Sequence, residues 1–215
     1  MLIKNQDGRV ILLKMVRAIQ ENKDYLSEID GMIGDGDHGI NMNKGFTMYQ
    51  EQLAEKPVRF TDGLADLGLL LLNQIGGSMG PIYGTIFLSM SESADNADEI
   101  TLQTFSSMME NGLRSLYDIV DARPGDKTLV DTLYPACRSI KESSDQQLSF
   151  TAALDAMKAA AASGMVLTRN LTAKYGRASR LGERSRGVLD AGAVSCCILL
   201  SAMADGMLEV MLKED

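Results

Sequence analysis

Apolar residues recur along most of the chain with the spacing of an α-helix. Two stretches show this clearly, with apolar positions three or four residues apart: Leu102, Phe105, Met109, Leu113, Leu116 and Val120 in the first, and Phe150, Leu154, Met157 and Ala161 in the second. Such spacing gathers apolar side chains on one face of a helix. Ser149 precedes the second stretch and is predicted to cap that helix, because its hydroxyl can accept a hydrogen bond from a free N–H group. The alternation typical of a half-buried strand is not sustained anywhere in the sequence.

The same pattern predicts about eight helices joined by short linkers. Their expected ranges are 6–22, 39–55, 60–75, 78–95, 101–121, 127–144, 149–171 and 188–212. Short linkers favour antiparallel neighbours. Residues 172–187, TAKYGRASRLGERSRG, are too rich in Gly, Ser and Arg for a helix that faces a core. The sequence therefore predicts an all-α fold, and its 215 residues fit one domain that spans residues 1–215.

Composition and charge disfavour several classes of protein. Lys plus Arg total 21 against 29 Asp plus Glu, a net charge of −8, which disfavours nonspecific binding of nucleic acid or of an anionic membrane. The three cysteines, Cys137, Cys196 and Cys197, are odd in number and fit buried positions in a reducing compartment better than a disulfide. The N-terminal residues show no signal-peptide pattern. A cytoplasmic location is therefore expected.

The uncharged segment from Leu67 to Ser91 is long enough to span a bilayer. Its middle, however, contains the sequence GGSMGP, which would leave backbone groups without hydrogen-bond partners at bilayer depth. Two buried helices that meet at a glycine turn explain this segment better, and no contact with a membrane is expected.

The loop GDGDHGINMN, residues 34–43, matches the dinucleotide fingerprint G-x-G-x-x-G, but two of its variable positions are aspartates. That fingerprint also requires a preceding strand, which an all-helical chain lacks. An EF-hand would need an Asp where Ile33 stands and a Glu where Lys44 stands. A Walker loop is absent, because GDKT at residues 125–128 lacks the upstream glycine. These three ways of binding a nucleotide or a cation are therefore excluded.

Three carboxylates remain within eight residues: Asp30, Asp35 and Asp37. Carboxylate oxygens prefer hard cations, and Mg²⁺ is typically held by a few carboxylates together with substrate phosphates. The glycines allow a tight turn, and the helix that begins near residue 39 offers free N–H groups to phosphates. The sequence predicts a Mg²⁺ site here that binds phosphate through the metal. A solvated turn with an Asp cap is the alternative.

Three further stretches have compositions that are unusual for segments with a purely structural role. Residues 76–85, GGSMGPIYGT, suit either close approach of a ligand to the backbone or a packing turn between two helices. Residues 122–133, ARPGDKTLVDTL, suit a turn and a helix start, and the pattern alone assigns them no function. Between Lys174 and Arg186, five basic residues accompany a single acidic one, Glu183, in an otherwise acidic chain. This concentration of charge suggests a flexible lid over phosphates, with a solvated loop as the alternative.

Taken together, these segments resemble the DhaL family, the nucleotide-binding subunits of bacterial dihydroxyacetone kinases, over nearly the whole chain. The resemblance rests on Asp30 and on four segments in this order: GDGDHGINMNKG, GGSMGPIYGT, RPGDKTLVDTL and GRASRLGERSRGVLDAG. It implies a closed up-and-down barrel of eight antiparallel helices with the nucleotide at one rim. It also implies that Asp30, Asp35 and Asp37 are Mg²⁺ ligands that bridge to the phosphates of ADP or ATP.

The family's ADP contacts fall on specific positions of this chain. They are His38, Gly39, Ile40, Asn41, Ser78, Met79, Leu129, Arg177, Asp190, Ala191 and Gly192. Many relatives read GHxDPG where this chain has GVLDAG, so that Val188 and Ala191 depart from the pattern. We expect these two differences to change how the lid closes over the adenine without abolishing binding.

The resemblance further implies a function and two partners. Family members of the phosphotransferase system keep ADP bound as a cofactor, and a phosphohistidine carrier protein recharges it to ATP. The γ-phosphoryl group then passes to dihydroxyacetone held covalently by a separate substrate-binding subunit. The chain has one histidine and no second one for a covalent ketone site. No catalytic side chain is expected, because phosphoryl transfer mainly demands positioning and charge neutralisation.

Several alternatives stay open at this point. The chain could belong to an ATP-dependent kinase with exchangeable nucleotide, to a relay protein phosphorylated on His38, or to a regulatory module that docks on another protein when loaded with ADP. A histidine among aspartates could also hydrogen-bond a phosphate or serve the fold alone. The identity of the small hydroxyketone and the formation of a homodimer are left open.

Overall fold

The computed structural model describes residues 2–53 and 57–212, and within them the chain is almost entirely helical. The described residues form nine α-helices: α1 (Gly8–Glu21), α2 (Lys23–Ile33), α3 (His38–Gln52), α4 (Phe60–Gln74), α5 (Met79–Glu92), α6 (Leu102–Ile119), α7 (Val130–Asp145), α8 (Phe150–Leu167) and α9 (Ala191–Leu212). Two 3-10 segments, η1 (Thr168–Asn170) and η2 (Arg177–Ser185), connect α8 to α9. Strand β1 (Ile3–Lys4) pairs antiparallel with β2 (Glu99–Ile100). The all-α class is confirmed.

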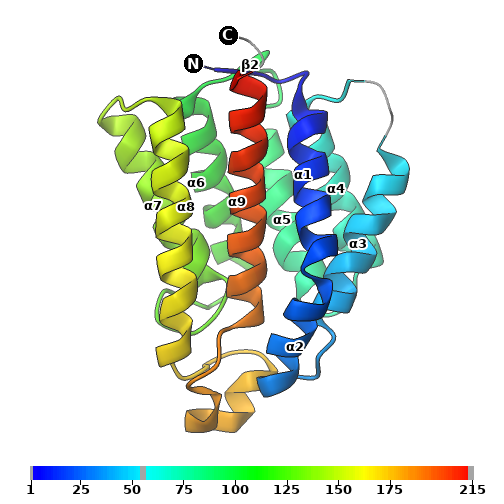
Figure 1. Cartoon of the computed structure of the whole chain (residues 1–215), viewed down its shortest axis with the longest axis vertical. Helices are drawn as coiled ribbons and strands as arrows, with labels where there is room; N and C mark the ends of the chain where they lie inside the picture. The colour runs from blue at the N-terminus through cyan, green and yellow to red at the C-terminus, as the bar shows by residue number, and fades with distance from the viewer. Residues whose placement is uncertain (1, 54–56, 213–215) are drawn as a thin grey trace.

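Most of the helices run along the long axis of the molecule (Figure 1). From α4 to α9, each helix packs against the next in the sequence. The first and last helices, α1 and α9, also lie side by side, and α1 packs on α3 and α4 as well. These contacts agree with neighbours that alternate in direction. Closure of the helices into a barrel remains a prediction.

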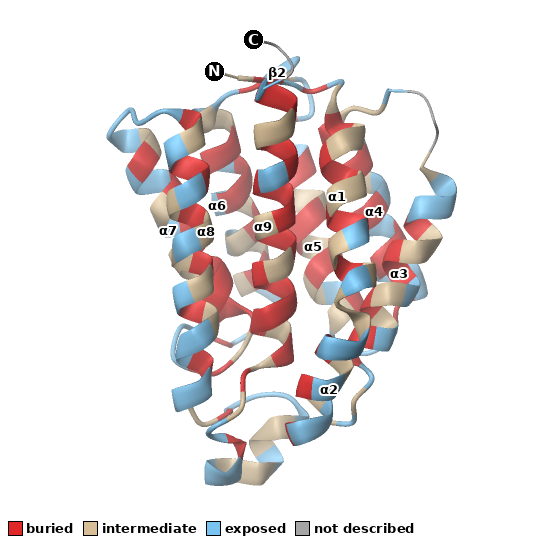
Figure 2. Ribbon diagram, viewed as in Figure 1, coloured by how far each residue is buried: buried red, intermediate tan, exposed pale blue. Residues whose placement is uncertain are grey.

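The core is built from the inward faces of these helices (Figure 2). Helix α1 has a single apolar stripe, which consists of Ile11, Leu12, Met15, Val16 and Ile19. Helix α9 is apolar around most of its surface because α1, α2, α7 and α8 all pack on it. By length and composition alone, α9 and the segment Phe150–Asn170 could each cross a membrane. Burial within the bundle accounts for the apolar surface of α9.

The predicted cap of α8 is confirmed. Ser149 has an extended backbone, and its hydroxyl accepts a hydrogen bond from the backbone N–H of Ala152. Thr101 caps α6 in the same way, through the N–H of Thr104. Both caps satisfy N–H groups that a helix cannot satisfy internally.

Helix α2 is not predicted by the sequence pattern. It has only 11 residues, three of which are buried apolar ones, and Asn22 alone separates it from α1. The short strands β1 and β2 are not predicted either. The helix expected at 127–144 begins at Val130, because the preceding loop is held by hydrogen bonds to Asp131. Residues 54 and 55 of the expected helix 39–55 lie outside the described residues.

Two other predicted boundaries near the site also need correction. The helix expected at 149–171 changes to a 3-10 turn after Leu167, and the helix expected at 188–212 begins at Ala191. The remaining boundaries agree within about three residues, which is the usual uncertainty at helix ends.

Four linkers lie at one end of the bundle, opposite the two chain ends (Figure 1). They connect α2 to α3, α4 to α5, α6 to α7 and α8 to α9. Because helices that alternate in direction return to the same end at every second linker, segments that are distant in the sequence meet there. All the residues for which we expect a functional role belong to these linkers or to the helix turns beside them.

Candidate functional site

The aspartate loop joins α2 to α3 and brings together the three carboxylates expected to bind metal. Asp30 belongs to the last turn of α2, while Asp35 and Asp37 lie in the linker. One oxygen from each of the three lies within 4.8 Å of the others. Two ligands on opposite sides of a Mg²⁺ ion are about 4.2 Å apart, since each Mg–O bond is about 2.1 Å long. The three carboxylates therefore lie nearly close enough to share one such ion.

Two glycines shape this loop. Gly36 has a φ of 77°, a left-handed conformation that permits the turn between Asp35 and Asp37. Gly39 lies in the first turn of α3, where an added Cβ would collide with the backbone carbonyl of Lys23 and with Ser27. A side chain at position 39 would push α3 away from α2. Gly39 thus fixes the approach of α3 to the helix that carries Asp30.

The first turn of α3 contains the predicted contacts His38, Gly39, Ile40 and Asn41. The backbone N–H of His38 donates to Asp30 Oδ2 at 3.3 Å, and that of Asn41 donates to the carbonyl of Asp37 at 2.9 Å. The side chain of Ile40 is exposed. The first N–H groups of a helix have no partner within the helix, and the helix dipole is positive there. This turn is suited to bind an anion next to the three carboxylates.

The imidazole of His38 points into the protein. It is only 9% exposed, and its Nε2 lies 2.9 Å from Ser195 Oγ. Burial lowers the pKa of His38 to about 4, although the charge of Asp30 acts in the opposite direction. The ring is therefore neutral near pH 7 and faces the interior of the protein. Only the backbone N–H of His38 contacts Asp30 beside the aspartate loop.

Ser195 connects three segments of the site through buried hydrogen bonds. Its Oγ also lies 2.6 Å from the hydroxyl of Tyr83 on α5, and it donates to the carbonyl of Gly192 at 3.1 Å. Burial raises the pKa of Tyr83 well above its usual value, so the phenol stays protonated. The start of α9 is thus tied to the start of α3 and to the second turn of α5. The sequence pattern gives no signal for Ser195 or Tyr83.

The glycine turn between α4 and α5 combines both interpretations left open by the sequence. An added Cβ on Gly76 or Gly77 would meet nothing within 4 Å, and Gly77 has a φ of 71°. At Gly80, by contrast, a Cβ would collide with the carbonyls of Ile75 and Leu71. The turn is open before the predicted contacts Ser78 and Met79, which begin α5, and tightly packed after them.

The start of α9 contains the predicted contacts Asp190, Ala191 and Gly192. The N–H of Asp190 donates to Thr168 Oγ1 at 3.1 Å, and its carboxylate accepts from the N–H of Ala193 at 2.8 Å. Burial raises the pKa of Asp190 to about 6, while the N–H of Ala193 and the charge of Lys127 lower it. An added Cβ on Gly192 would lie 3.5 Å from the Cβ of Leu129. Leu129, another predicted nucleotide contact, therefore lies beside the first turn of α9.

The segment with many arginines folds as η2, in two 3-10 turns separated by a kink at Gly182. Arg177 lies at its start and places its guanidinium 2.5 Å from Asp35 Oδ2. The side chain of Arg177 is 65% exposed and that of Asp35 is 34% exposed. Arg177 therefore lies against one of the predicted metal ligands. We call residues 172–187 the arginine loop below.

The loop between α6 and α7 is more elaborate than the sequence suggests. The carboxylate of Asp131 accepts hydrogen bonds from the N–H groups of Gly125 and Thr128. Asp126 forms an ion pair with Lys174 of the arginine loop, and Lys127 is buried with a φ of 60°. From this region the sequence indicates only Leu129, through the resemblance, because Lys174, which pairs with Asp126, and the partners of Lys127 lie more than 40 residues away.

Comparison with known proteins identifies the class. A family model described as the DAK2 domain matches residues 32–205. The crystal structure of the dihydroxyacetone kinase from C. freundii in complex with AMP-PNP and Mg²⁺ has a TM-score of 0.67 to this chain. That likeness covers 93% of this chain and 33% of the other at 21% identity, and so it supports the fold alone.

Two relatives of similar length are more specific. The ADP-binding subunit DhaL of the PEP-dependent dihydroxyacetone kinase of Escherichia coli (strain K12) is 38% identical over 184 residues, which are 84% of this chain and 87% of that protein. The ADP-binding subunit DhaL of the PTS-dependent dihydroxyacetone kinase of Lactococcus lactis subsp. lactis (strain IL1403) is 34% identical over 193 residues, with coverages of 89% and 92%. The chain therefore belongs to the DAK2 domain family and, within it, to the DhaL-type subunits of dihydroxyacetone kinases.

The buried hydrogen bonds of Ser195 lead to a prediction about stability. Ser195→Ala should lower the free energy of unfolding by roughly 1–3 kcal/mol, because the buried Nε2 of His38 and hydroxyl of Tyr83 both lose a partner. Denaturant titration of this variant, of Tyr83→Phe and of the double variant measures the effect. The double variant should cost less than the sum of the two single ones. Ser163→Ala, an exposed change on α8, is the control, and equal stability of Ser195→Ala and the control would contradict the account.

Proposed function

We propose that this chain is the nucleotide-binding subunit of a dihydroxyacetone kinase of the phosphotransferase type. In this proposal, ADP stays bound with Mg²⁺ and is recharged to ATP by a phosphohistidine carrier protein. The γ-phosphoryl group then passes to dihydroxyacetone on a partner subunit. The observation that carries the proposal is the convergence of Asp30, Asp35 and Asp37 within 4.8 Å beside the first turn of α3. The similarity to relatives named as ADP-binding subunits of PEP-dependent and PTS-dependent kinases supports it.

The chemistry of the donors in the aspartate loop fits Mg²⁺. Three carboxylates on one loop supply oxygen ligands of the kind that this ion prefers, and the solvent-exposed positions of Asp35 and Asp37 leave room for phosphate and water ligands. When bound, the ion would neutralise charge on the phosphates. Arg177, now paired with Asp35, is near enough to contribute a further positive charge.

The nucleotide contacts are proposed on five parts of the chain at this end of the bundle. They are His38 to Asn41, Ser78 with Met79, Leu129, Arg177, and Asp190 to Gly192. The first turns of α3 and α5 can donate backbone N–H groups to phosphates. The open space over Gly76 and Gly77 leaves room for a ligand beside Ser78. Leu129 lies beside Gly192 at the start of α9, so that its apolar side chain and the backbone of Asp190 to Gly192 are close together.

The position of His38 argues against a relay protein phosphorylated on this residue. Its ring is buried, and its Nε2 is occupied by Ser195. A phosphoryl group on either ring nitrogen would need space and solvent that this position does not offer. Transfer through a bound nucleotide needs no nucleophile on this chain. It leaves positioning and charge neutralisation to the residues named above.

The metal assignment can be tested with single carboxamide substitutions. Asp35→Asn and Asp37→Asn should each weaken binding of Mg²⁺·ADP by at least about tenfold, because each removes a charged ligand. Isothermal calorimetry measures the affinity, and circular dichroism should show unchanged helicity, since both residues lie in a linker. Asp155→Asn, at an exposed position in α8, is the matched control. Affinities equal to that of the control would exclude these aspartates as metal ligands.

The second test asks whether the nucleotide is retained or exchanged. If the aspartate loop, the first turns of α3 and α5, and the arginine loop all hold one Mg²⁺-bridged diphosphate, several charge-assisted contacts must break before ADP leaves. The purified chain should therefore contain ADP, and it should not phosphorylate dihydroxyacetone alone. With the substrate-binding subunit and preloaded ATP, we expect one turnover per chain. Repeated turnover should need the phosphorylated carrier protein. Rapid repeated turnover with free ATP and no carrier would instead indicate an ATP-dependent kinase with exchangeable nucleotide.

A further inference from the structure

Lys127 is buried in a loop, which is an unusual position for a lysine. Its side chain is 1% exposed, although it lies in the linker between α6 and α7 at the end of the bundle. Its φ of 60° is in the left-handed region, which residues other than glycine and asparagine rarely adopt. A buried ammonium group is tolerated only where its N–H groups have partners. The partners of Lys127 identify the segments of the chain that it holds in place.

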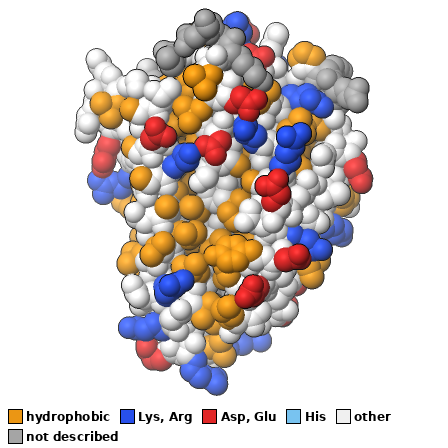
Figure 3. Space-filling model, viewed as in Figure 1, with side chains coloured by type: hydrophobic (Ala, Val, Ile, Leu, Met, Phe, Trp, Pro, Cys, Tyr) orange, Lys and Arg blue, Asp and Glu red, His pale blue; other side chains and the backbone are white. Residues whose placement is uncertain are grey.

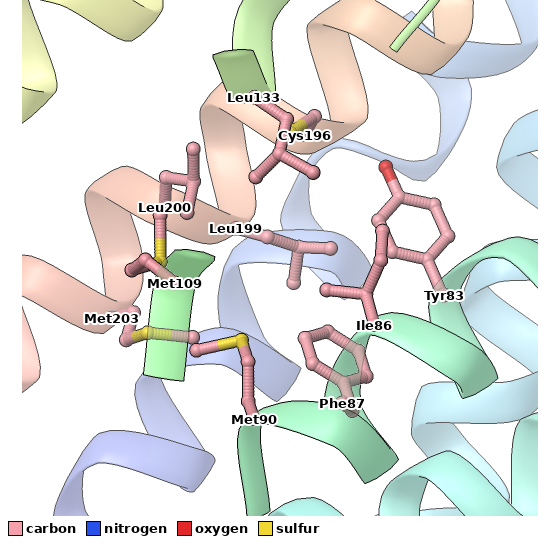
Figure 4. Close-up of a pocket in the computed structure, with 10 residues that line it drawn as sticks. All are labelled: Tyr83, Ile86, Phe87, Met90, Met109, Leu133, Cys196, Leu199, Leu200 and Met203. Atoms are coloured by element: carbon pink, nitrogen blue, oxygen red, sulfur yellow. The ribbon is translucent and has the colours of Figure 1, made fainter. Parts of the chain in front are cut away.

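The ammonium group of Lys127 donates to two backbone carbonyls, those of Thr168 and Val188. These residues lie just before and just after the arginine loop. The N–H of Gly187 also donates to the carbonyl of Arg169 at 2.7 Å, directly beside these two contacts. One side chain thus binds both ends of the loop that carries Arg177. None of these residues lines the small apolar cavity between Tyr83, Phe87 and Met203 (Figure 4).

The neighbouring residue fastens the same loop at a third point. Asp126 is 6% exposed, its carboxylate pairs with Lys174 at 2.5 Å, and its carbonyl accepts a hydrogen bond from the N–H of Lys174 at 3.2 Å. The carboxylate also accepts from the N–H of Arg123 at 2.8 Å, which fixes its own orientation. Two adjacent residues of the linker between α6 and α7 therefore anchor the arginine loop. Lys127 holds the residues that flank its two ends, and Asp126 holds Lys174 near its beginning.

The contact with Val188 also reaches the start of α9. Asp190 follows two residues later, and its N–H donates to Thr168, the other residue that Lys127 binds. Burial lowers the pKa of Lys127, and the charges of Asp190 and Asp131 oppose this change. The ammonium group is thus held near two carboxylates as well as two carbonyls. Its loss would free both the arginine loop and the segment Asp190 to Gly192.

We propose that Lys127 is a positioning residue that anchors the arginine loop and the start of α9 in the geometry that retains the nucleotide. Its effect on the nucleotide rests on the proposed function, whereas its effect on the loop does not. Lys127 itself is too deeply buried to contact a ligand at the end of the bundle. It acts through Arg177, which belongs to the loop, and through Asp190, which follows it.

The test replaces the ammonium group by an apolar end of similar length. Lys127→Met should expose the arginine loop to trypsin after Arg180 and Arg184 on the order of tenfold faster than the wild type, because two hydrogen bonds from a charged group are lost. The digestion is performed on the nucleotide-free chain, where it reports the anchoring alone. In the presence of Mg²⁺, ADP should dissociate from the variant faster by a similar factor. Both cuts should fall within residues 172–187, and a general loss of stability would not produce this localised pattern.

Lys158→Met is the control, because it removes a lysine ammonium group away from the arginine loop, one that pairs with Asp205 between α8 and α9. Both rates should match the wild type in the control. A folded Lys127→Met chain with wild-type cleavage and wild-type ADP dissociation overturns the proposal. If Lys127→Met does not fold, Lys127→Gln decides, because its shorter, neutral amide keeps a polar end but loses the two hydrogen bonds from a charged group. Faster cleavage after Arg180 in Lys127→Gln supports the anchoring, and unchanged cleavage overturns it. Failure of the wild type to bind Mg²⁺·ADP would contradict the proposed function, while the cleavage of the nucleotide-free chain would still test the role of Lys127.

Discussion

Repulsion among the three carboxylates of the aspartate loop is the constraint on which the site depends. Asp30, Asp35 and Asp37 place three negative charges within 4.8 Å, an arrangement that is unfavourable unless positive charge balances it. Two balancing contacts come from the chain itself: the guanidinium of Arg177 on Asp35 and the N–H of His38, at the positive end of α3, on Asp30. We propose that a divalent cation offsets the remaining negative charge. In that proposal, the arginine loop, the start of α3 and the ion together balance the charge of the three carboxylates.

The helical body of the protein makes this balance possible because it brings the linkers that carry the site to one end. The core consists almost entirely of apolar side chains from the long helices (Figure 2). On the face shown in Figure 3, charged side chains of both signs lie among apolar ones. Two buried polar side chains near the site, by contrast, tie one segment of the site to another. Ser195 joins the starts of α3 and α9, and Lys127 joins the linker between α6 and α7 to the arginine loop. Such long-range ties fix the relative positions of four linkers that are distant in the sequence.

Local patterns in the sequence predict the helical class and most helix positions, because helix periodicity and caps such as Ser149 depend on neighbouring residues. Helix α2 escapes prediction, since it is short, has only three buried apolar residues and is separated from α1 by Asn22 alone. The three aspartates can be predicted as a group because they lie within eight consecutive residues. The inward orientation of His38 cannot be predicted, because its partner Ser195 is 157 residues away. Lys127 is hidden for the same reason, since its partners are 41 and 61 residues away.

The central claim is that the aspartate loop binds the metal of a metal–nucleotide complex. It is tested most directly by a crystal structure of the chain with ADP and Mn²⁺, an ion that takes the same oxygen ligands as Mg²⁺ and is located by its anomalous scattering. The account predicts that the anomalous peak marks an ion bound by one oxygen from each of Asp30, Asp35 and Asp37 and by a phosphate oxygen of ADP. An ADP molecule bound at another part of the protein, or an ion with none of these three carboxylates among its ligands, would contradict the account.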